Sequence, residues 1–187
     1  PLGREARPKQ VLRITGRDPM LVQTVRRIRP LIPGRRVTLV ADAVQTRAAR
    51  KLLPRLPKDS FLVEPLARNT APALMLATAR IWLDNPEAVV AVLPADHLIR
   101  DEARFLRLLR AGAEAASKER ALVTFGIPPT YPATGYGYIR HDRAGGKRIG
   151  GEVFHPVLGF KEKPGLAQAD EYLASGDYAW NSGMFLW

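Results

Sequence analysis

The sequence contains no cysteine, few histidines and no long apolar run. Without cysteine there is no disulfide, no thiolate metal site and no cysteine nucleophile, and such a composition suits a cytoplasmic protein. Because a bilayer-spanning helix needs roughly 20 consecutive apolar residues, we predict no membrane segment. The three histidines have no metal-ligand spacing, and no Ser–His–Asp order indicates a nucleophilic triad.

Basic residues outnumber acidic ones by 29 to 18, which gives the 187-residue chain a formal net charge of +11. Such an excess favours anionic partners, namely nucleic acid, a membrane surface or phosphate-rich small molecules. Arg100, Arg104, Arg107 and Arg110 recur at helical spacing, which is typical of a solvated helix face rather than a nucleic-acid patch. No aromatic residues alternate with the basic ones, and no zinc-finger or RNP-type motif is present. We therefore expect no nucleic-acid partner.

Short apolar runs alternate with helical patterns in the first two thirds of the chain. We predict strands at residues 37–41, 61–63, 88–93 and 121–127, with helices between them at 43–53, from Asn69 or Thr70 to about Leu83, and at 101–118. Strands that alternate with helices form βαβ units, so this order predicts a doubly wound parallel or mixed sheet. The run AVVAVL at 88–93 is apolar throughout, as expected of a strand covered on both faces.

Beyond Ile127 the pattern changes to a loop rich in proline and glycine, followed by short strands. We predict strands at 136–140, at 152–160 after a turn at Gly145-Gly146, and at 184–187, with a helix at 166–174. No internal repeat or low-complexity segment is present. A chain of this length fits one domain, so we predict a single domain over residues 1–187 with a second binding half after the first.

Asp96 follows the strand predicted at 88–93 directly. In open α/β sheets, ligands bind beyond the carboxyl ends of the strands. A carboxylate at this place can hold Mg²⁺ against phosphate oxygens. The alternative is that Asp96 only caps the next turn, and the residues by themselves leave both interpretations open.

Three further polar residues are candidates for the binding of a nucleotide. Glu64 follows the strand at 61–63, and its carboxylate can accept both hydrogens from an edge like that of guanine, or it orders its own loop. Asn69 fits a ligand contact and equally fits the N-cap of the next helix. Lys9 stands before an apolar segment, where a compact charge suits a phosphate, although a lone lysine is usually only solvated.

The second half of the chain offers candidates for a polar ligand. Glu162 and Lys163 stand together at the end of a predicted strand, where they can bind a hydroxyl and a phosphate or form a plain surface pair. Gly135 and Gly137 permit close backbone approach to a ligand, or they make a turn. Asn181 can hydrogen-bond a polar ligand or the backbone.

These separate signals occur in one order along the chain, and that order resembles the mannose-1-phosphate guanylyltransferases, a family of sugar-phosphate nucleotidyltransferases. The motifs that carry the resemblance are Pro1-Leu2 with Arg4 and Arg7-Pro8-Lys9-Gln10, Glu64-Pro65 with Arg68-Asn69-Thr70-Ala71-Pro72-Ala73, Leu93-Pro94-Ala95-Asp96-His97, Thr124-Phe125-Gly126-Ile127 with Pro129-Thr130 and Thr134-Gly135-Tyr136-Gly137-Tyr138-Ile139, Phe160 with Glu162-Lys163-Pro164, and Trp180-Asn181-Ser182-Gly183-Met184-Phe185. They span nearly the whole chain. Each motif is modest alone, but six in the right order are specific.

The resemblance implies a fold and a role for each candidate residue. The implied fold is a Rossmann-like doubly wound mixed sheet with a small inserted sugar-binding β region. The implied catalytic residues are Lys9, Asp96 and Lys163, with Asp96 as the Mg²⁺ ligand. The implied nucleotide-binding residues are Arg7, Lys9, Glu64, Asn69 and Thr70, with guanine near Glu64 or Asn69. The implied sugar-binding residues are Gly135, Tyr136, Glu162, Lys163 and Asn181, with Lys163 on the sugar phosphate.

Three features depart from the family pattern. The glycine-rich segment that precedes Pro1 in the family is absent, and so is a second metal-binding aspartate expected beyond Trp187. We therefore expect one nucleotidyltransferase domain that lacks its N-terminal glycine-rich loop and its C-terminal part. Ala133 also stands where the family usually has glutamate.

The function that the resemblance implies is the transfer of GMP from GTP to mannose 1-phosphate, giving GDP-mannose and pyrophosphate by Mg²⁺-assisted in-line displacement. The expected partners are these two substrates, with no nucleic acid and no membrane, in a cytoplasmic homodimer. Two alternatives stay open. One is a related nucleotidyltransferase with another base or sugar, and the other is a non-catalytic paralogue that binds GDP-mannose as a regulatory subunit.

Overall fold

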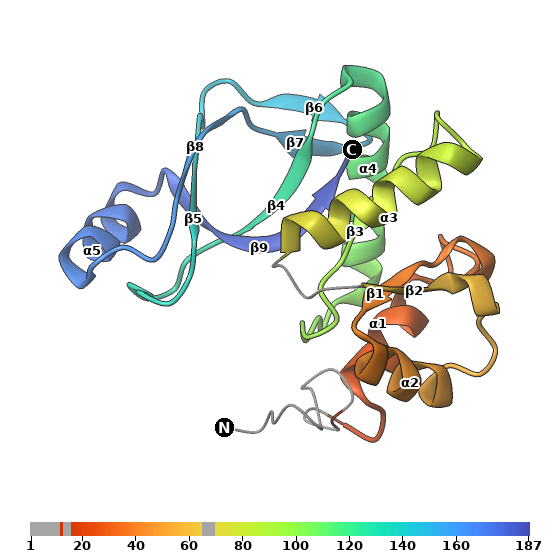
Figure 1. Cartoon of the computed structure of the whole chain (residues 1–187). Helices are drawn as coiled ribbons and strands as arrows, with labels where there is room; N and C mark the ends of the chain where they lie inside the picture. Colours follow the sequence, from red (N-terminus) through yellow and green to blue (C-terminus); the bar gives the residue numbers. More distant parts are fainter. Residues whose placement is uncertain (1–11, 13–15, 65–69) are drawn as a thin grey trace. The chain divides into compact units, whose positions relative to one another are not determined.

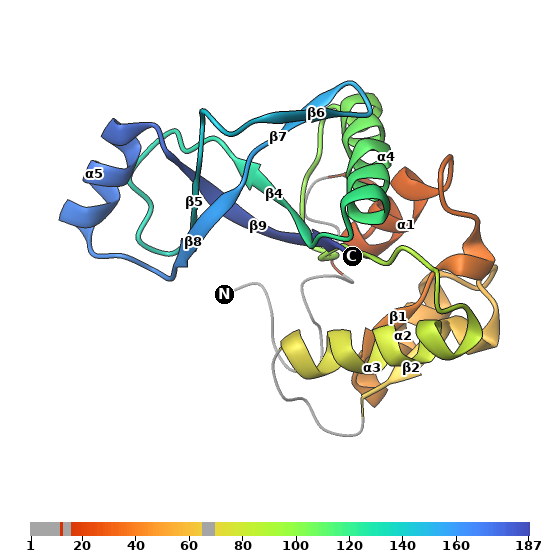
Figure 2. The same ribbon diagram turned by 90° about the horizontal axis from the view of Figure 1, so that it is seen from above.

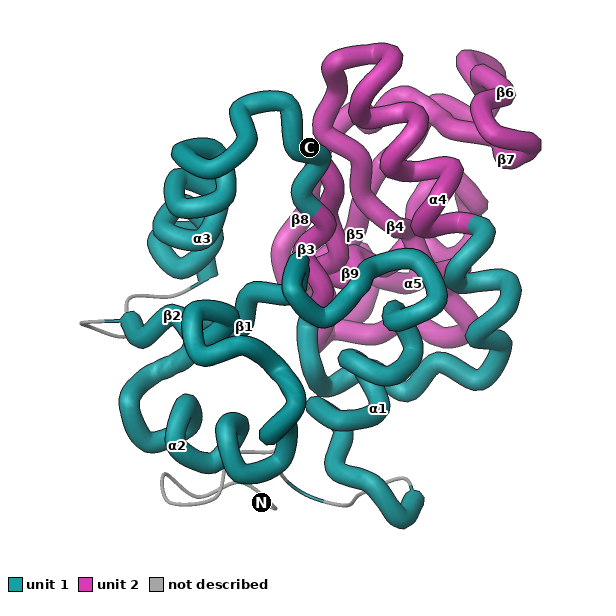
Figure 3. Tube along the Cα trace, turned by 90° about the vertical axis from the view of Figure 1, so that its right-hand side faces the viewer, with its two compact units in different colours: residues 1–90, 94–107 teal, residues 91–93, 108–187 magenta. Residues whose placement is uncertain are grey.

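The computed structural model describes Leu12 and residues 16–64 and 70–187 of the chain (Figure 1). The chain divides into two compact units, which Figure 3 shows in different colours. Unit 1 comprises residues 1–90 and 94–107, and unit 2 comprises residues 91–93 and 108–187. This division groups residues by their contacts within the chain and does not decide the number of domains. The single domain over residues 1–187 stays a prediction.

Unit 1 is mainly helical and contains one short pair of parallel strands. Its elements are α1 (Met20–Ile28), the 3₁₀ helix η2 (Gly34–Arg36), β1 (Leu39–Ala41), α2 (Ala43–Leu52), the 3₁₀ helix η3 (Lys58–Ser60), β2 (Phe61–Val63), α3 (Thr70–Asp84) and the first turns of α4 (Glu102–Glu119). Leu39 lies opposite Phe61 in the parallel ladder, and Ala41 lies opposite Val63. The amide of Glu64 extends this ladder by donating to the carbonyl of Ala41 at 2.9 Å.

Local contacts explain how the helices of unit 1 are held. Asp42 N-caps α2, because its side chain accepts a hydrogen bond from the amide of Gln45 at 2.7 Å. Helix α1 buries an apolar stripe made of Met20, Leu21, Val25 and Ile28. The same helix buries Arg27, whose Nε lies 3.4 Å from the Oε1 atom of Glu102 at the start of α4. A buried cation needs such a partner, so this ion pair ties α1 to the beginning of α4.

Helix α3 in unit 1 exposes several large apolar side chains. Met75, Trp82 and Leu83 on this helix are all exposed, and none of its residues is buried. Even so, no helix in the described parts of the chain is both long and apolar enough to cross a membrane.

Unit 2 is built around one long central strand (Figures 1 and 2). Its elements are β3 (Ala91–Val92), the greater part of α4, β4 (Val123–Ile127), β5 (Tyr138–His141), β6 (Lys147–Ile149), β7 (Glu152–Phe154), β8 (Val157–Lys161), α5 (Leu166–Ser175) and β9 (Tyr178–Leu186). Strand β9 pairs antiparallel with β3, β4 and β5, and β5 also pairs with β8. Strands β6 and β7 form a separate hairpin. The whole second half of the chain is therefore organised by β9.

Helices pack at the two ends of β9. At its beginning, α5 contributes Ala169 and Tyr172 to a buried cluster with Tyr138. The ring of Tyr172 stacks on Tyr178 of β9, with centroids 3.9 Å apart. At the other end of β9, the side chain of Leu186 is almost fully buried and reaches α4. These contacts fix both ends of the central strand.

Most predicted elements are confirmed, with ends that shift by a few residues. The strand at 61–63 is present as β2, and the predicted helices at 43–53, 101–118 and 166–174 are α2, α4 and α5. The α/β class and the mixed strand directions are confirmed too. The described strands pair in three separate sheets, a partition that strand patterns do not reveal because they carry no information on partners.

Two predicted strands were too long. The strand predicted at 88–93 shortens to Ala91–Val92, because only these residues meet β9. The strand predicted at 152–160 breaks into β7 and β8 around Pro156. Proline has no amide hydrogen to donate to a ladder, so a break at this residue is expected on physical grounds.

Other elements were missed or too short in the prediction. Strand β9 begins at Tyr178 rather than at Met184 as predicted. The Asn-Ser-Gly sequence within it has low strand propensity, so the pattern indicates a strand only beyond it. Helix α1 was not predicted, although its apolar residues recur at helical spacing after Pro19. The charged strand β6 was not predicted either.

Replacing Asp42 with alanine should lower the free energy of unfolding by about 1 kcal/mol, because the amide of Gln45 loses its acceptor. Asp42→Asn should lose much less, since asparagine caps helices as well as aspartate does. Urea denaturation followed by circular dichroism measures both variants. Equal losses in the two variants would contradict the capping role.

Candidate functional site

The predicted nucleotide-side residues fall in unit 1 or outside the described residues. Glu64 is half-buried at the end of β2, and Thr70 is the exposed first residue of α3. The first turn of α3 contains no acidic residue, so nothing in that turn neutralises the positive end of the helix dipole. Arg7, Lys9 and Asn69 lie outside the described residues.

Asp96 is exposed in a turn after β3. Helix α4 is capped by Asp101, whose Oδ1 atom accepts the amide of Arg104 at 2.8 Å in the first turn of that helix. Across the described ranges, no group of three or more histidine or acidic side chains could hold a metal ion. Mg²⁺ requires only one or two carboxylates, because phosphate oxygens and waters complete its shell. A single exposed aspartate therefore fits a metal shared with a phosphate ligand.

In unit 2, Gly137, Glu162 and Asn181 come together from three parts of the chain. The amide of Asn181 donates to the carbonyl of Gly137 at 2.8 Å. A Cβ atom on Gly137 would lie 2.9 Å from the Oε2 atom of Glu162 and 3.6 Å from the Cβ atom of Asn181. The carboxylate of Glu162 and the side chain of Asn181 thus both lie close to the backbone of Gly137. Glu162 is exposed and Asn181 is half-buried, so a carboxylate and an amide stand side by side within reach of a ligand.

A β-bulge in β9 orients Asn181. The register between β4 and β9 shifts at this point, and Gly183 has a φ of +70°, a left-handed conformation that favours glycine. The Oδ1 atom of Asn181 accepts the amide of Gly183 at 3.0 Å, and Oγ of Ser182 accepts the amide of Met184 at 3.2 Å. The oxygen of the Asn181 amide is thus used inside the bulge, and its NH₂ group can donate to a ligand.

Lys163 adopts an unusual backbone conformation directly after Glu162. Its φ of +43° lies in the left-handed region, which costs a non-glycine residue about 1–3 kcal/mol and is concentrated at functional sites. Its Nζ atom lies 3.7 Å from the Oε1 atom of Glu162, but both side chains are mostly exposed, so this ion pair contributes little stability. The strained backbone, rather than the ion pair, distinguishes Lys163 from an ordinary surface lysine.

Gly135 and Tyr136 lie on the loop that leads into β5. A Cβ atom on Gly135 would meet nothing within 4 Å, so this position is open. The ring of Tyr136 packs edge-on against Trp180 with centroids 5.2 Å apart, and Tyr131 does the same at 4.9 Å. The hydroxyl of Tyr131 donates to that of Tyr136 at 3.5 Å, and this hydrogen bond raises the pKa of Tyr131 above its ordinary value.

The structure therefore brings Glu162, Lys163 and Asn181 together. It adds Gly137, for which the sequence left close approach to a ligand and a plain turn both open. The backbone pairing of Gly137 with Asn181 makes it part of the group, and this pairing depends on strand register, which the sequence does not show. Gly135 stays a predicted contact.

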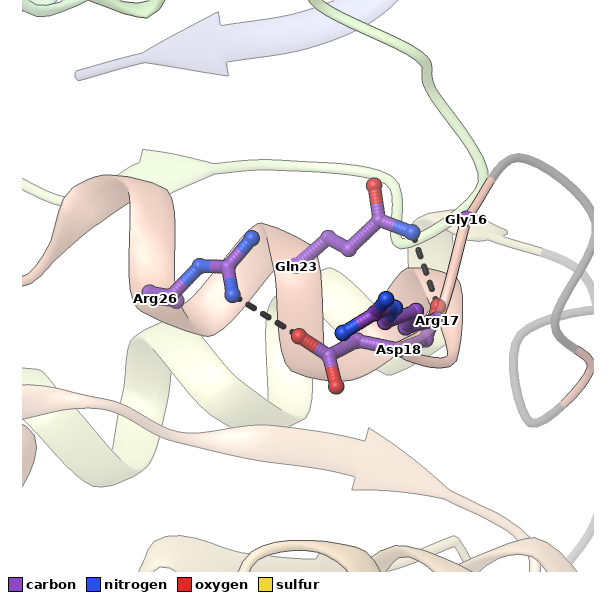
Figure 4. A pocket seen from close by; sticks show the side chains of 5 residues that line it. All are labelled: Gly16, Arg17, Asp18, Gln23 and Arg26. Carbon is purple, nitrogen blue, oxygen red and sulfur yellow. Dashed lines mark hydrogen bonds and ion pairs between the residues drawn. The ribbon is translucent and has the colours of Figure 1, made fainter.

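A separate hollow of about 280 Å³ lies beside α1 in unit 1, as Figure 4 shows. Its lining consists of Gly16, Arg17, Asp18, Gln23 and Arg26. Arg26 donates to the Oδ2 atom of Asp18 at 2.7 Å, and the side-chain amide of Gln23 donates to the carbonyl of Asp18 at 2.8 Å. The carboxylate and one arginine of the hollow thus satisfy each other, and none of the predicted site residues that the structure describes lines it.

Known proteins resemble this chain over its entire length. A family model described as nucleotidyl transferase matches residues 1–187. The xanthan biosynthesis protein XanB of Xanthomonas campestris pv. campestris (strain B100) is 43% identical over 187 residues. The mannose-1-phosphate guanylyltransferase RfbM of Salmonella typhimurium (strain LT2) is 42% identical over 190 residues. Both matches cover 100% of this chain and 38% of the relative, so the chain spans well under half the length of these relatives.

A solved structure is also similar to this chain. The crystal structure described as a mannose-1-phosphate geranyltransferase from Thermus thermophilus matches with a TM-score of 0.84 and 35% sequence identity. The match covers 100% of this chain and 52% of that chain. This likeness confirms the expected Rossmann-like α/β fold. Together with the family model over residues 1–187, it shows that this chain belongs to the nucleotidyl transferase family.

Proposed function

We propose that the protein transfers GMP from GTP to mannose 1-phosphate, giving GDP-mannose and pyrophosphate. The observation that carries this proposal is the convergence of Glu162 and Asn181 on Gly137, with Lys163 alongside. A carboxylate and an amide can bind the hydroxyls of a sugar, and a neighbouring ammonium group can bind a phosphate. This combination suits a sugar phosphate. The relative RfbM, which is named a mannose-1-phosphate guanylyltransferase, supports this choice of sugar and nucleotide.

On the sugar side, each residue has a role that follows from its chemistry. The carboxylate of Glu162 accepts hydrogen bonds from sugar hydroxyls, and the NH₂ group of Asn181 donates to them. Gly135 and Tyr136 surround the sugar from the neighbouring loop. Lys163 binds the phosphate of mannose 1-phosphate, where the ammonium group is a compact counter-charge.

On the nucleotide side, the proposal follows the resemblance. Arg7 and Lys9 contact the nucleotide phosphates. Glu64 and Asn69 lie near guanine, and the half-buried carboxylate of Glu64 suits an edge with two hydrogen-bond donors. Thr70 adds a hydroxyl at the start of α3, where the amides of the first turn favour anions.

The reaction is a single in-line displacement. An oxygen of mannose 1-phosphate attacks the α-phosphorus of GTP, and the bond to the β-phosphate oxygen breaks so that pyrophosphate leaves. Both reactants are anions that repel each other, so the site must neutralise charge and align the reacting atoms. Lys163 acts from the sugar-phosphate side and Lys9 from the nucleotide side. A direct displacement of this kind needs no nucleophile from the protein.

Asp96 is the residue that we propose as the ligand of Mg²⁺. Its carboxylate is exposed in a turn, where it can reach a cation. When bound, the ion supplies positive charge to the phosphate oxygens of the substrates. The role of Asp96 would be to hold this positive charge beside the turn after β3.

The predictions of a homodimer, a cytoplasmic location and no nucleic-acid partner belong to the same proposal. Light scattering on the purified protein gives its mass and so decides between monomer and dimer. A gel shift with single- and double-stranded nucleic acids at low salt tests the third prediction, since electrostatic binding is strongest there.

The choice of substrates has a direct test. Incubation with GTP, ATP, UTP or dTTP and a panel of sugar 1-phosphates, followed by chromatography of the products, should show GDP-mannose as the main product. Preference for another nucleotide or sugar would favour the related nucleotidyltransferase that the sequence left open. Binding of GDP-mannose without any turnover would favour the regulatory paralogue.

Asp96→Asn should lower turnover by orders of magnitude, because the neutral amide holds a cation poorly. Asp101→Asn is the matched control. It removes the same charge from a neighbouring stretch of the chain, while asparagine still caps α4, so its turnover should stay near that of the wild type. Steady-state kinetics with saturating Mg²⁺ measures both. Near-normal activity of Asp96→Asn would refute the metal assignment.

Lys163→Ala and Lys163→Gly separate the charge of this residue from its backbone conformation. Both remove the ammonium group, so kcat/KM for mannose 1-phosphate should fall by about tenfold or more in each. Glycine relieves the left-handed strain, so Lys163→Gly should be more stable than Lys163→Ala by about 1 kcal/mol. Kinetics and thermal unfolding test the two effects independently, and a fall in kcat/KM for only one variant would argue against a role of the charge.

A further inference from the structure

The loop at residues 128–137 is held at several points, although it is rich in proline and glycine. The hydroxyl of the fully buried Tyr138 donates to the carbonyl of Ala133 at 2.9 Å. The amide of Ala133 donates to the carbonyl of Tyr131, also at 2.9 Å. These two bonds fold the loop back toward the start of β5, where Gly137 pairs with Asn181.

Trp180 supports the same loop from β9. Its ring receives Tyr131 and Tyr136 edge-on, at centroid separations of 4.9 and 5.2 Å, within the range of favourable aromatic pairs. The two tyrosines are about half exposed, at 49% and 47%, and the hydroxyl of one donates to that of the other. Two tyrosines from one loop thus pack against a single tryptophan.

The polar atom of Trp180 shows that the residue is not optimised for stability alone. Its Nε1 atom is buried and has no hydrogen-bond partner among the described residues. An unsatisfied buried donor costs free energy, and phenylalanine would avoid that cost. What tryptophan offers at this place is a ring large enough to meet both tyrosines at once.

The strand register links this aromatic contact to the sugar side of the proposed site. Trp180 on β9 is paired with Tyr138 on β5. Their chain neighbours Asn181 and Gly137 are therefore next to this pair. The hydrogen bond from Asn181 to Gly137 is therefore adjacent to the ring that holds the loop. A shift of the loop would alter the spacing of Gly137 from Glu162 and Asn181, which is already close.

We propose that Trp180, Tyr131 and Tyr136 form a positioning cluster for the sugar-phosphate substrate. The cluster holds the loop so that Gly137 keeps its place beside Glu162 and Asn181. Trp180 and Tyr131 act through Gly137 and do not touch the reacting atoms. The inference rests on the proposed function, because that function assigns the sugar phosphate to these residues.

Kinetics of Trp180→Ala and Trp180→Phe test the cluster. Trp180→Ala should raise KM for mannose 1-phosphate about tenfold or more while KM for GTP stays within about twofold, because loss of positioning affects only the substrate held there. Trp180→Phe has a smaller ring that keeps only part of the contact with the two tyrosines, so its KM for mannose 1-phosphate should lie between those of Trp180→Ala and the wild type. Trp82→Ala is the matched control, since this tryptophan is exposed on α3 and should change neither KM. Equal increases in both KM values, or none, would overturn the proposal.

A second measurement needs neither turnover nor substrate. Hydrogen exchange of the Asn181 amide should be faster in Trp180→Ala than in the wild type and intermediate in Trp180→Phe, because that amide is bonded to the loop. Tyr131→Ala changes an exposed residue and should show the same exchange effect even if Trp180→Ala fails to fold. Unchanged exchange in Tyr131→Ala would refute the cluster. Lack of wild-type turnover with GTP and mannose 1-phosphate would instead refute the proposed function.

Discussion

The hydrogen-bonding requirement of the β9 backbone organises unit 2. A buried strand must find partners for its amides and carbonyls, and β9 does so with β4 on one edge and with β5 and β3 on the other. These pairings collect segments that are remote in the sequence, residues 91–92, 123–127 and 138–141. The contact between Gly137 and Asn181 exists only because β5 and β9 meet in this register.

The candidate sugar site lies where this regular pairing is interrupted. The bulge at Asn181–Gly183 uses two side-chain oxygens to satisfy amides that the ladder leaves out. Lys163, at the end of the neighbouring β8 segment, holds a left-handed conformation. Such irregularities cost free energy, so they persist only where the surrounding structure holds them. Here the surrounding structure is β9 with its neighbouring strands, together with the loop that packs against Trp180.

Three of the acidic residues proposed for the chemistry share a position relative to their strands. Glu64 follows β2, Asp96 follows β3 and Glu162 follows β8. Side chains just beyond the end of a strand are free to reach a ligand, whereas Asn181 lies within β9 at its bulge. This explains why polar residues of such different kinds could be identified as candidates before any contact was known.

The sequence by itself determined the α/β class, most helices and strands, and the family, because periodicity, caps such as Asp42 and short motifs are local properties of the chain. It did not determine the extent of β9, the partners of the strands or the inclusion of Gly137 in the sugar-side group. These features depend on register, and a slip of one residue would exchange the two faces of a strand. No local pattern shows that Trp180 supports a loop that lies far earlier in the chain. Only the tertiary structure decided these features, because pairing between distant strands is a property of the folded backbone rather than of any segment.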